Sequence, residues 1–284
     1  MPDHFFRSAI LSILVAIGLT ACVTTNSDQT TFSARLPDGT SVDIRGLLAK
    51  PEGNGPFPAV VLLHTCGGVR SHVSEDWPRF LVKEGYVTFT VDSFGSRGLG
   101  TCPNALVGPR ASVSFSDRMH TLLADATGAL DYLAARPFVR KDRIAVAGYS
   151  LGGMTIHFAL MSAGPRSPGG NSFVAAASFY GPCAIHPPGR AAPIEMKQLQ
   201  ASPLPLLEVI GEKDERIARD CKALLPKDKS VELHILPGIY HAFDSSEIRS
   251  MRYDFAGHPM LYDSGATEKS KALMAAFLKR TMGN

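Results

Sequence analysis

Short apolar runs, separated by stretches of helical periodicity, follow one another along most of the chain. Residues 58–64 are apolar at nearly every position, which is typical of a parallel strand buried on both faces. Comparable runs lie at residues 86–91, 143–147, 173–180, 205–211 and 231–236. Between them, apolar positions at helical spacing predict helices over residues 75–83, 116–135, 152–161, 217–225 and 267–282. This alternation predicts an α/β fold with a mainly parallel central sheet and helices on both faces.

Three segments depart from the alternation. Residues 32–48 form two short runs around Pro37-Asp38-Gly39, which predicts an antiparallel hairpin. Residues 162–171 and 242–266 show neither the strand nor the helix period. Because the last segment directly follows His241, we expect it to form one wall of a pocket and to influence substrate selectivity.

The composition indicates a folded protein without a nucleic-acid partner. Of 284 residues, 45% are hydrophobic and 19% charged, which argues against disorder. The formal net charge of +3 is small and its sources are spread along the chain, unlike the basic patch of a nucleic-acid-binding protein. No metal-binding or nucleotide-binding motif is found, so we expect neither a metal nor a cofactor.

The N-terminus has the pattern of an export signal. Arg7 precedes an apolar stretch at residues 9–19, too short for a comfortable membrane span but of signal-peptide length. The sequence Leu19-Thr20-Ala21-Cys22 resembles a bacterial lipobox, so we expect residues 1–21 to be removed and Cys22 to be lipidated. Residues 22–30 then form a polar tether and residues 31–284 the folded domain, on the periplasmic side of the cell envelope. An ordinary secretory signal and a buried apolar segment are the alternatives.

A strand, a sharp turn and a helix surround the pentapeptide Gly148-Tyr149-Ser150-Leu151-Gly152. This is the G-x-S-x-G motif in the setting that presents a nucleophilic serine. The two glycines leave room where side chains would collide with the neighbouring strand and helix. The motif therefore predicts Ser150 as a nucleophile, and a chance glycine-rich turn is the alternative.

A serine needs a base and a group that orients the base. In this fold the partners follow in the order serine, acid, histidine. Asp214 and His241 each come just after an expected strand, at the sheet edge where sites form. We therefore expect Ser150 to attack, His241 to take its proton and Asp214 to orient the imidazole.

Other residues compete for both roles. Glu212, Glu215 and Asp244 lie close to the expected acid and base along the chain, so a short loop could present any of them. Among the other histidines, His234 lies within a strand and His157 within the helix after Ser150, while His186 and His258 lie in irregular segments. These four are weaker candidates because no strand end positions them.

Backbone N–H groups must also stabilise the negative charge that develops on the substrate oxygen. We expect one from Leu151, at the start of the helix after the serine. The second is expected from Cys66, with Thr65 or Gly67 as alternatives, in the loop where residues 58–64 end. A plain turn made by Gly67-Gly68 is the competing interpretation.

Five segments together resemble the dienelactone hydrolase family of the α/β-hydrolase superfamily, in its serine-nucleophile form. They are residues 60–68 (VVLLHTCGG), 91–98 (VDSFGSRG), 148–153 (GYSLGG), 211–214 (GEKD) and 240–243 (YHAF). They occur in family order, and the resemblance spans residues 31–281. It implies an α/β-hydrolase fold without a large lid, hydrolysis of esters or lactones, and catalysis by Ser150, Asp214 and His241.

The chain departs from the family's namesake enzymes, which have cysteine in the position of Ser150, and this puts dienelactone itself in doubt as the substrate. Two further residues are candidates for substrate binding. Arg97 follows the strand at residues 86–91 and either holds a substrate carboxylate by a bidentate contact or pairs with a local acid. His64 ends a strand close to the expected site and is a candidate for the pocket lining.

Export gives the remaining cysteines a structural meaning. Once Cys22 is set aside, four remain, an even number in an oxidising compartment. We predict the disulfides Cys66–Cys102 and Cys183–Cys221, the second of which would clamp the loops that carry the acid. Four buried thiols are the alternative.

The sequence therefore predicts an exported, lipid-anchored serine hydrolase that cleaves a small ester or lactone through an acyl-enzyme on Ser150. A peptidase or acyltransferase using the same triad is a first alternative. A non-catalytic envelope binding protein that retains the fold is a second, because fold does not determine function.

Overall fold

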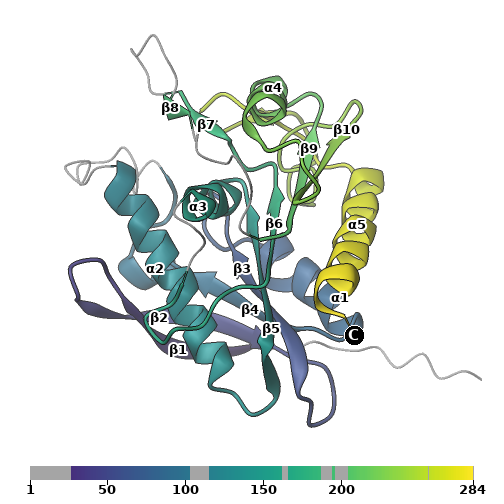
Figure 1. Cartoon of the computed structure of the whole chain (residues 1–284). Coiled ribbons are helices and arrows are strands. Elements are labelled where there is room, and N and C mark those ends of the chain that lie inside the picture. Colours follow the sequence, from purple (N-terminus) through teal and green to yellow (C-terminus); the bar gives the residue numbers. More distant parts are fainter. Residues whose placement is uncertain are drawn as a thin grey trace, which may run out of the picture.

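Eight strands form one sheet in the order β1-β2-β4-β3-β5-β6-β9-β10 (Figure 1). The pairings from β4 to β10 are parallel, whereas β1 with β2 and β2 with β4 are antiparallel. The strands are β1 (Asp28–Arg35), β2 (Ser41–Ala49), β3 (Phe57–Leu63), β4 (Val87–Asp92), β5 (Val139–Tyr149), β6 (Ala175–Phe179), β9 (Leu206–Gly211) and β10 (Val231–Leu236). The predicted mainly parallel sheet is confirmed.

The structure is a computed structural model that describes residues 27–102, 115–161, 166–186, 194–195, 204–254 and 256–283. The predicted signal peptide and Cys22 lie outside these residues. Among the described residues, no helix combines the length and the apolar composition that a membrane span requires.

Helices cover both faces of the sheet, as the periodicity predicts. Helices α2 (Phe115–Ala134) and α3 (Leu151–Leu160) lie on one face, and α1 (Trp77–Lys83) and α5 (Ser264–Met282) lie on the other (Figure 1). Helix α4 (Glu215–Leu224) packs its apolar side into the same core as α2 and α3. Each lies within three residues of its predicted bounds, except that a π-helical turn, η1 (His72–Asp76), precedes α1.

The predicted hairpin is present, but it begins earlier than expected. Strand β1 pairs with β2 from Asp28 opposite Leu48 to Arg35 opposite Ser41. The tether predicted to end at residue 30 is therefore wrong at its C-terminal end, because Asp28 already belongs to the sheet. Residues 28–30 are polar and show no apolar strand pattern, so the sequence does not reveal that β1 begins there. Backbone pairing with β2 supplies the hydrogen bonds of these residues.

The segment without periodicity at residues 242–266 folds around a small two-stranded sheet, β11 (Arg252–Tyr253) with β12 (Pro259–Met260). Another such sheet pairs β7 (Ala184–Ile185) with β8 (Ile194–Glu195). A 3-10 turn, η2 (Gly95–Arg97), follows β4. These additions lie at or beyond the C-terminal ends of the parallel strands, the edge at which sites form in such sheets.

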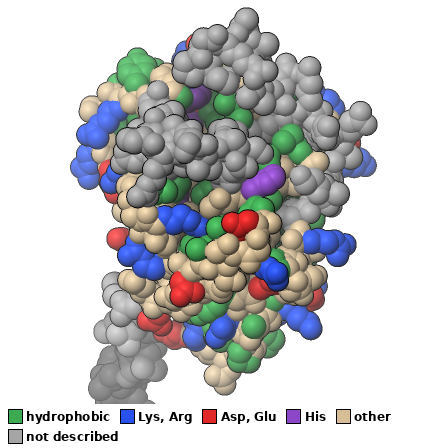
Figure 2. Space-filling model, turned by 90° about the vertical axis from the view of Figure 1, so that its left-hand side faces the viewer, with side chains coloured by type: hydrophobic (Ala, Val, Ile, Leu, Met, Phe, Trp, Pro, Cys, Tyr) green, Lys and Arg blue, Asp and Glu red, His purple; other side chains and the backbone are tan. Residues whose placement is uncertain are grey.

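Charges of both signs are mixed on the face that carries α2 and the β1–β2 hairpin. Figure 2 shows Lys and Arg side chains interspersed with Asp and Glu over the described part of this face. Neither sign gathers there into a single patch.

Candidate active site

Ser150 lies at a sharp turn between β5 and α3, in the position that the motif predicts. Its backbone has φ 52° and ψ −107°, a strained conformation for a residue with a side chain. A Cβ at Gly148 would lie 2.3 Å from the backbone of Gly152, and one at Gly152 would lie 2.4 Å from the carbonyl oxygen of Leu63. Both glycines are therefore required by close packing, and together they allow this turn.

Three side chains from three different strand ends form one hydrogen-bonded chain. The hydroxyl Oγ of Ser150 lies 3.0 Å from Nε2 of His241, and Nδ1 of His241 lies 2.5 Å from Oδ2 of Asp214. All three side chains are buried. If His241 carries its proton on Nδ1 and donates it to Asp214, then Nε2 is free to accept the proton of Ser150.

The charges of this chain reinforce one another. Burial alone would raise the pKa of Asp214, but the attraction and hydrogen bond of His241, together with the hydrogen bond of His258, hold that pKa at about 2. Burial likewise works to lower the pKa of His241, yet the charge and hydrogen bond of Asp214 raise it above its usual value. An ionised Asp214 therefore favours the protonated imidazole that proton transfer from Ser150 would create.

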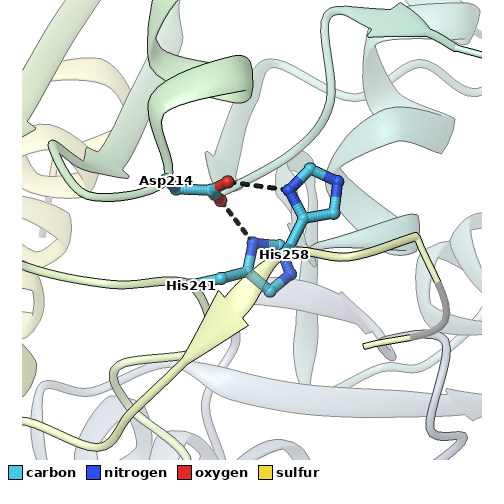
Figure 3. Close-up of side chains that lie close together, drawn as sticks. All are labelled: Asp214, His241 and His258. Carbon is cyan, nitrogen blue, oxygen red and sulfur yellow. Dashed lines mark hydrogen bonds and ion pairs between the residues drawn. The ribbon is translucent and has the colours of Figure 1, made fainter. Parts of the chain in front are cut away.

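His258 is the residue of this site that sequence reasoning missed. Its Nδ1 lies 2.8 Å from Oδ1 of Asp214, so two histidines donate to the two oxygens of one carboxylate (Figure 3). The sequence ranks it below His241 because it lies in an irregular segment where no strand end positions it. The only local signal is the turn in which Oδ1 of Asp254 accepts from the backbone N–H of Ala256 and of His258, and such a turn does not reveal a partner.

The competing acids have other partners. Asp244 is buried and accepts hydrogen bonds from the indole of Trp77 at 2.7 Å and the hydroxyl of Tyr180 at 2.6 Å. The Tyr180 ring also packs edge-on against His241. This network therefore contacts the base through an aromatic ring, whereas the hydrogen bond to His241 comes from Asp214. Glu212 accepts from the backbone N–H of Gly238, and Glu215 is exposed on α4.

The competing histidines lie away from Ser150. His157 is fully buried and bonds to the carboxylate of Glu208 at 2.8 Å, as expected for a packed residue. His186 pairs with Asp220 directly after β7, and His234 lies half-buried within β10. Among the histidines in the described part of the chain, only His241 reaches the serine by a hydrogen bond.

Two backbone N–H groups are available as the oxyanion donors that the mechanism requires. In the described chain, no acceptor is found for the N–H of Cys66 or of Leu151. The N–H of Gly67 is instead used, because it donates to the hydroxyl of Thr65 at 3.0 Å. The free donors are thus the two that the sequence favours, and Gly67 becomes the weaker alternative.

Both predicted disulfides, Cys66–Cys102 and Cys183–Cys221, are present. The first links the loop that carries the candidate oxyanion donor to Cys102, whose N–H also donates to the carbonyl of Cys66 at 2.7 Å. The second joins the segment before β7 to α4, the helix that begins directly after Asp214. The expected clamp on the acid's loop is therefore formed.

The two candidate substrate-binding residues point elsewhere. The guanidinium of Arg97 makes a bidentate contact with the fully buried carboxylate of Asp125, which is the local-acid alternative. His64 is buried, packs edge-on against Phe94 and bonds through Nδ1 to the carbonyl of Thr65. Neither side chain lines the cavity that contains Ser150 and His241.

That cavity has a volume of about 380 Å³. Part of its lining comes from the segment at residues 242–266, as predicted, and part from residues 65–72, which follow β3. The lining residues are Thr65, Cys66, Gly67, Arg70, His72, Thr101, Ser150, His241, Ala242, Ser245, Glu247, Ile248, Arg252, Asp254 and Met260. The guanidinium groups of Arg70 and Arg252 therefore line the same cavity as Ser150, and in the described chain neither forms an ion pair.

Asp214, His241 and His258 also offer three potential metal ligands within 4.8 Å of one another. Their nitrogen and oxygen atoms are already joined by the two hydrogen bonds to the carboxylate. A cation could enter only by displacing both bridging protons, so the arrangement fits proton handling better than metal binding.

Comparison with known proteins agrees with this geometry. The model of the dienelactone hydrolase family matches residues 44–282. A Bradyrhizobium protein assigned as a 2-oxo-3-(5-oxofuran-2-ylidene)propanoate lactonase is 28% identical over 202 residues, covering 69% of this chain and 77% of its own. A Synechocystis protein assigned as a carboxymethylenebutenolidase is 27% identical over 157 residues, covering 54% and 60%.

Solved structures show the same fold. The crystal structure assigned as a dienelactone hydrolase from Klebsiella pneumoniae superimposes with a TM-score of 0.62 at 19% identity, covering 89% of this chain and 99% of that one. The match of the family model spans most of the sequence and includes all three members of the hydrogen-bonded chain. The protein therefore belongs to the dienelactone hydrolase family and is an ester or lactone hydrolase of the α/β-hydrolase fold.

Proposed function

We propose that this protein is an exported serine hydrolase that opens lactones or cleaves carboxylic esters through an acyl-enzyme on Ser150. The observation that carries the proposal is the continuous chain of hydrogen bonds from Ser150 through His241 to Asp214. A serine, a base and a group that orients the base are the parts that this chemistry needs.

In the first half-reaction, Oγ of Ser150 attacks the substrate carbonyl carbon while Nε2 of His241 takes the hydroxyl proton. The negative charge that forms on the carbonyl oxygen is stabilised by the backbone N–H groups of Cys66 and Leu151. The carbon–oxygen bond of the ester then breaks, and His241 returns the proton to the leaving alkoxide. In a lactone that alcohol stays attached to the acyl group.

In the second half-reaction, a water molecule replaces the alcohol. His241 accepts a proton from the water as its oxygen attacks the acyl carbon, and the same two N–H groups stabilise the second oxyanion. His241 then protonates Oγ of Ser150 as the acyl bond breaks, which releases the acid and restores the free enzyme. Asp214 remains ionised throughout and stabilises the imidazolium.

We further propose that the substrate carries a carboxylate, held by Arg70 and Arg252. Glu247 and Asp254 line the same cavity but are occupied, since Glu247 accepts from the hydroxyl of Ser71 at 2.7 Å and Asp254 accepts backbone N–H groups of its own turn. Glu247 also attracts Arg70 through space, but neither guanidinium has a carboxylate in direct contact in the described chain, so both can take an anion. The propanoate in the name of the Bradyrhizobium relative's substrate supports an anionic lactone.

Export is supported by the lipobox-like sequence that ends at Cys22 and by the short tether before β1 at Asp28. The two disulfides fit an oxidising compartment, the periplasmic side of the envelope. On this proposal the lipidated Cys22 anchors the enzyme to a membrane.

Labelling with a fluorophosphonate probe tests the activated serine. We expect the wild-type protein to be labelled and the variants Ser150→Ala and His241→Ala to remain unlabelled. Absence of labelling in folded wild-type protein would favour the non-catalytic alternative. Paired aryl esters with and without a carboxylate then test the substrate class, since Arg70→Ala and Arg252→Ala should raise KM only for the anionic ester.

A further inference from the structure

His258 approaches the acid from a part of the fold that carries no member of the predicted triad. It lies between β11 and β12, and the next residue, Pro259, accepts the backbone N–H of His241 at 2.9 Å. Its ring stacks on that of His241 with centroids 5.2 Å apart and an interplanar angle of 23°. The small sheet therefore fixes His258 relative to both the base and the acid (Figure 3).

The contact at the second ring nitrogen of His258, Nε2, indicates which nitrogen carries the proton. Nη2 of Arg216 lies 3.3 Å from Nε2 of His258 and also donates to the carbonyl of Ala256. A guanidinium has only donors, so Nε2 must be the acceptor. The proton of His258 then lies on Nδ1, where it is donated to Oδ1 of Asp214, and the ring is neutral.

We infer that His258, held as the neutral Nδ1–H tautomer by Arg216, is a positioning residue that orients Asp214 for catalysis by His241. This inference rests on the proposed serine hydrolase function. With a donor on each oxygen, the carboxylate of Asp214 cannot rotate away from His241 without breaking a buried hydrogen bond. Because His258 is neutral, it fixes the carboxylate without adding a second positive charge beside the imidazolium.

The surrounding charges fit this arrangement. Asp254 accepts the backbone N–H of His258 from the β11–β12 turn, and Asp244 contributes its negative charge from the loop after His241. Arg216 approaches from the first turn of α4, and Asp214 and His241 from the ends of β9 and β10. Arg216 therefore occupies Nε2 of His258 and leaves Nδ1 as the nitrogen that donates to Asp214.

Kinetics of two matched variants test the positioning role. His258→Ala removes the donor, and we expect kcat to fall about 10- to 100-fold with little change in KM. His258→Asn places an amide N–H where Nδ1 lies and should recover most of kcat. His186→Ala, which removes a histidine–aspartate pair away from the serine, is the control and should match the wild type.

The pH profile separates positioning from a merely structural role. Without the donor from His258, the charge of Asp214 acts more strongly on His241, so the acidic limb of kcat/KM should move to higher pH in His258→Ala and return in His258→Asn. Thermal unfolding of each variant identifies simple loss of folding. Unchanged kinetics and an unshifted limb in folded His258→Ala would overturn the inference, as would equal losses in both variants.

Nitrogen-15 NMR of the histidine rings tests the tautomer without any substrate. At pH 7 we expect Nδ1 of His258 to be protonated and Nε2 to carry no proton. A proton on Nε2 in the wild type would refute the arrangement. This readout does not depend on activity, so it distinguishes failure of the inference from failure of the proposed function.

Discussion

The guanidinium of Arg97 and the carboxylate of Asp125 form a bidentate ion pair, with N···O distances of 2.7 and 2.8 Å. The pair joins η2 to the middle of α2, and Asp125 is fully buried. The same guanidinium also donates to the carbonyl of Ser93 at 2.9 Å. An arginine used in this way serves the fold and is not available to a substrate.

We therefore expect Arg97→Ala to affect stability rather than substrate binding. The substitution leaves the carboxylate of Asp125 buried without its partner, which should lower the free energy of unfolding by about 3 kcal/mol. Urea denaturation measures that loss, and KM for a carboxylate-bearing ester should stay near the wild-type value. A raised KM without loss of stability would instead mean that Arg97 binds the substrate. Arg70→Ala is the matched comparison, because it should raise KM for the same ester.

Replacing Asp214 by Asn should lower kcat by about three to four orders of magnitude while the fold persists. The negative charge of Asp214 raises the pKa of His241, and neutral His241 is the active base. Activity therefore falls as the pH drops through that pKa. Without the charge the pKa of His241 falls, so the acidic limb of the residual kcat/KM should move to lower pH.

Rate measurements across the pH range check this expectation, with circular dichroism as the control for folding. Nearly normal activity in Asp214→Asn would assign the orienting role to another acid, and buried Asp244, whose charge also raises the pKa of His241, is a candidate.

Removing the disulfide Cys66–Cys102 should weaken stabilisation of the transition state. The bond holds the loop that carries the N–H of Cys66, so we expect the double serine variant to lose at least about 10-fold in kcat. A boronate that mimics the tetrahedral intermediate should bind correspondingly less tightly.

The second disulfide, Cys183–Cys221, provides the comparison for stability. The two bonds span 36 and 38 residues, so chain entropy predicts similar losses of about 4 kcal/mol in unfolding free energy. Equal affinity of the two double variants for the boronate would mean that Cys66–Cys102 has no special role at the oxyanion.

Substituting Cys22 by Ser should release the protein from membranes if Cys22 carries the lipid. Fractionation of cells that produce each form measures the distribution between membrane and soluble fractions. Membrane association that is unchanged in Cys22→Ser would refute the anchor. Release of both forms would favour an ordinary secretory signal.

Much of this fold could be predicted from the chain because its signals are local. Buried parallel strands have nearly continuous apolar runs, which the sequence shows directly. Gly148 and Gly152 mark the sharp turn at Ser150, because a side chain at either position would collide with the neighbouring backbone. The same reasoning failed at residues 28–30, where polar residues form an edge strand whose stability comes from pairing with β2. Polar edge strands give little hydrophobic periodicity, so only the partner strand reveals them.

The sequence by itself determined the order of the main strands and helices along the chain, the sharp turn at Ser150 and the strand ends that carry Asp214 and His241. These depend on local pattern and on the rule that parallel strands end at one edge. Only the tertiary structure decided that Arg97 binds Asp125 and that His258 binds Asp214. Such contacts join side chains 28 and 44 residues apart through irregular turns, where no periodicity relates one residue to the other.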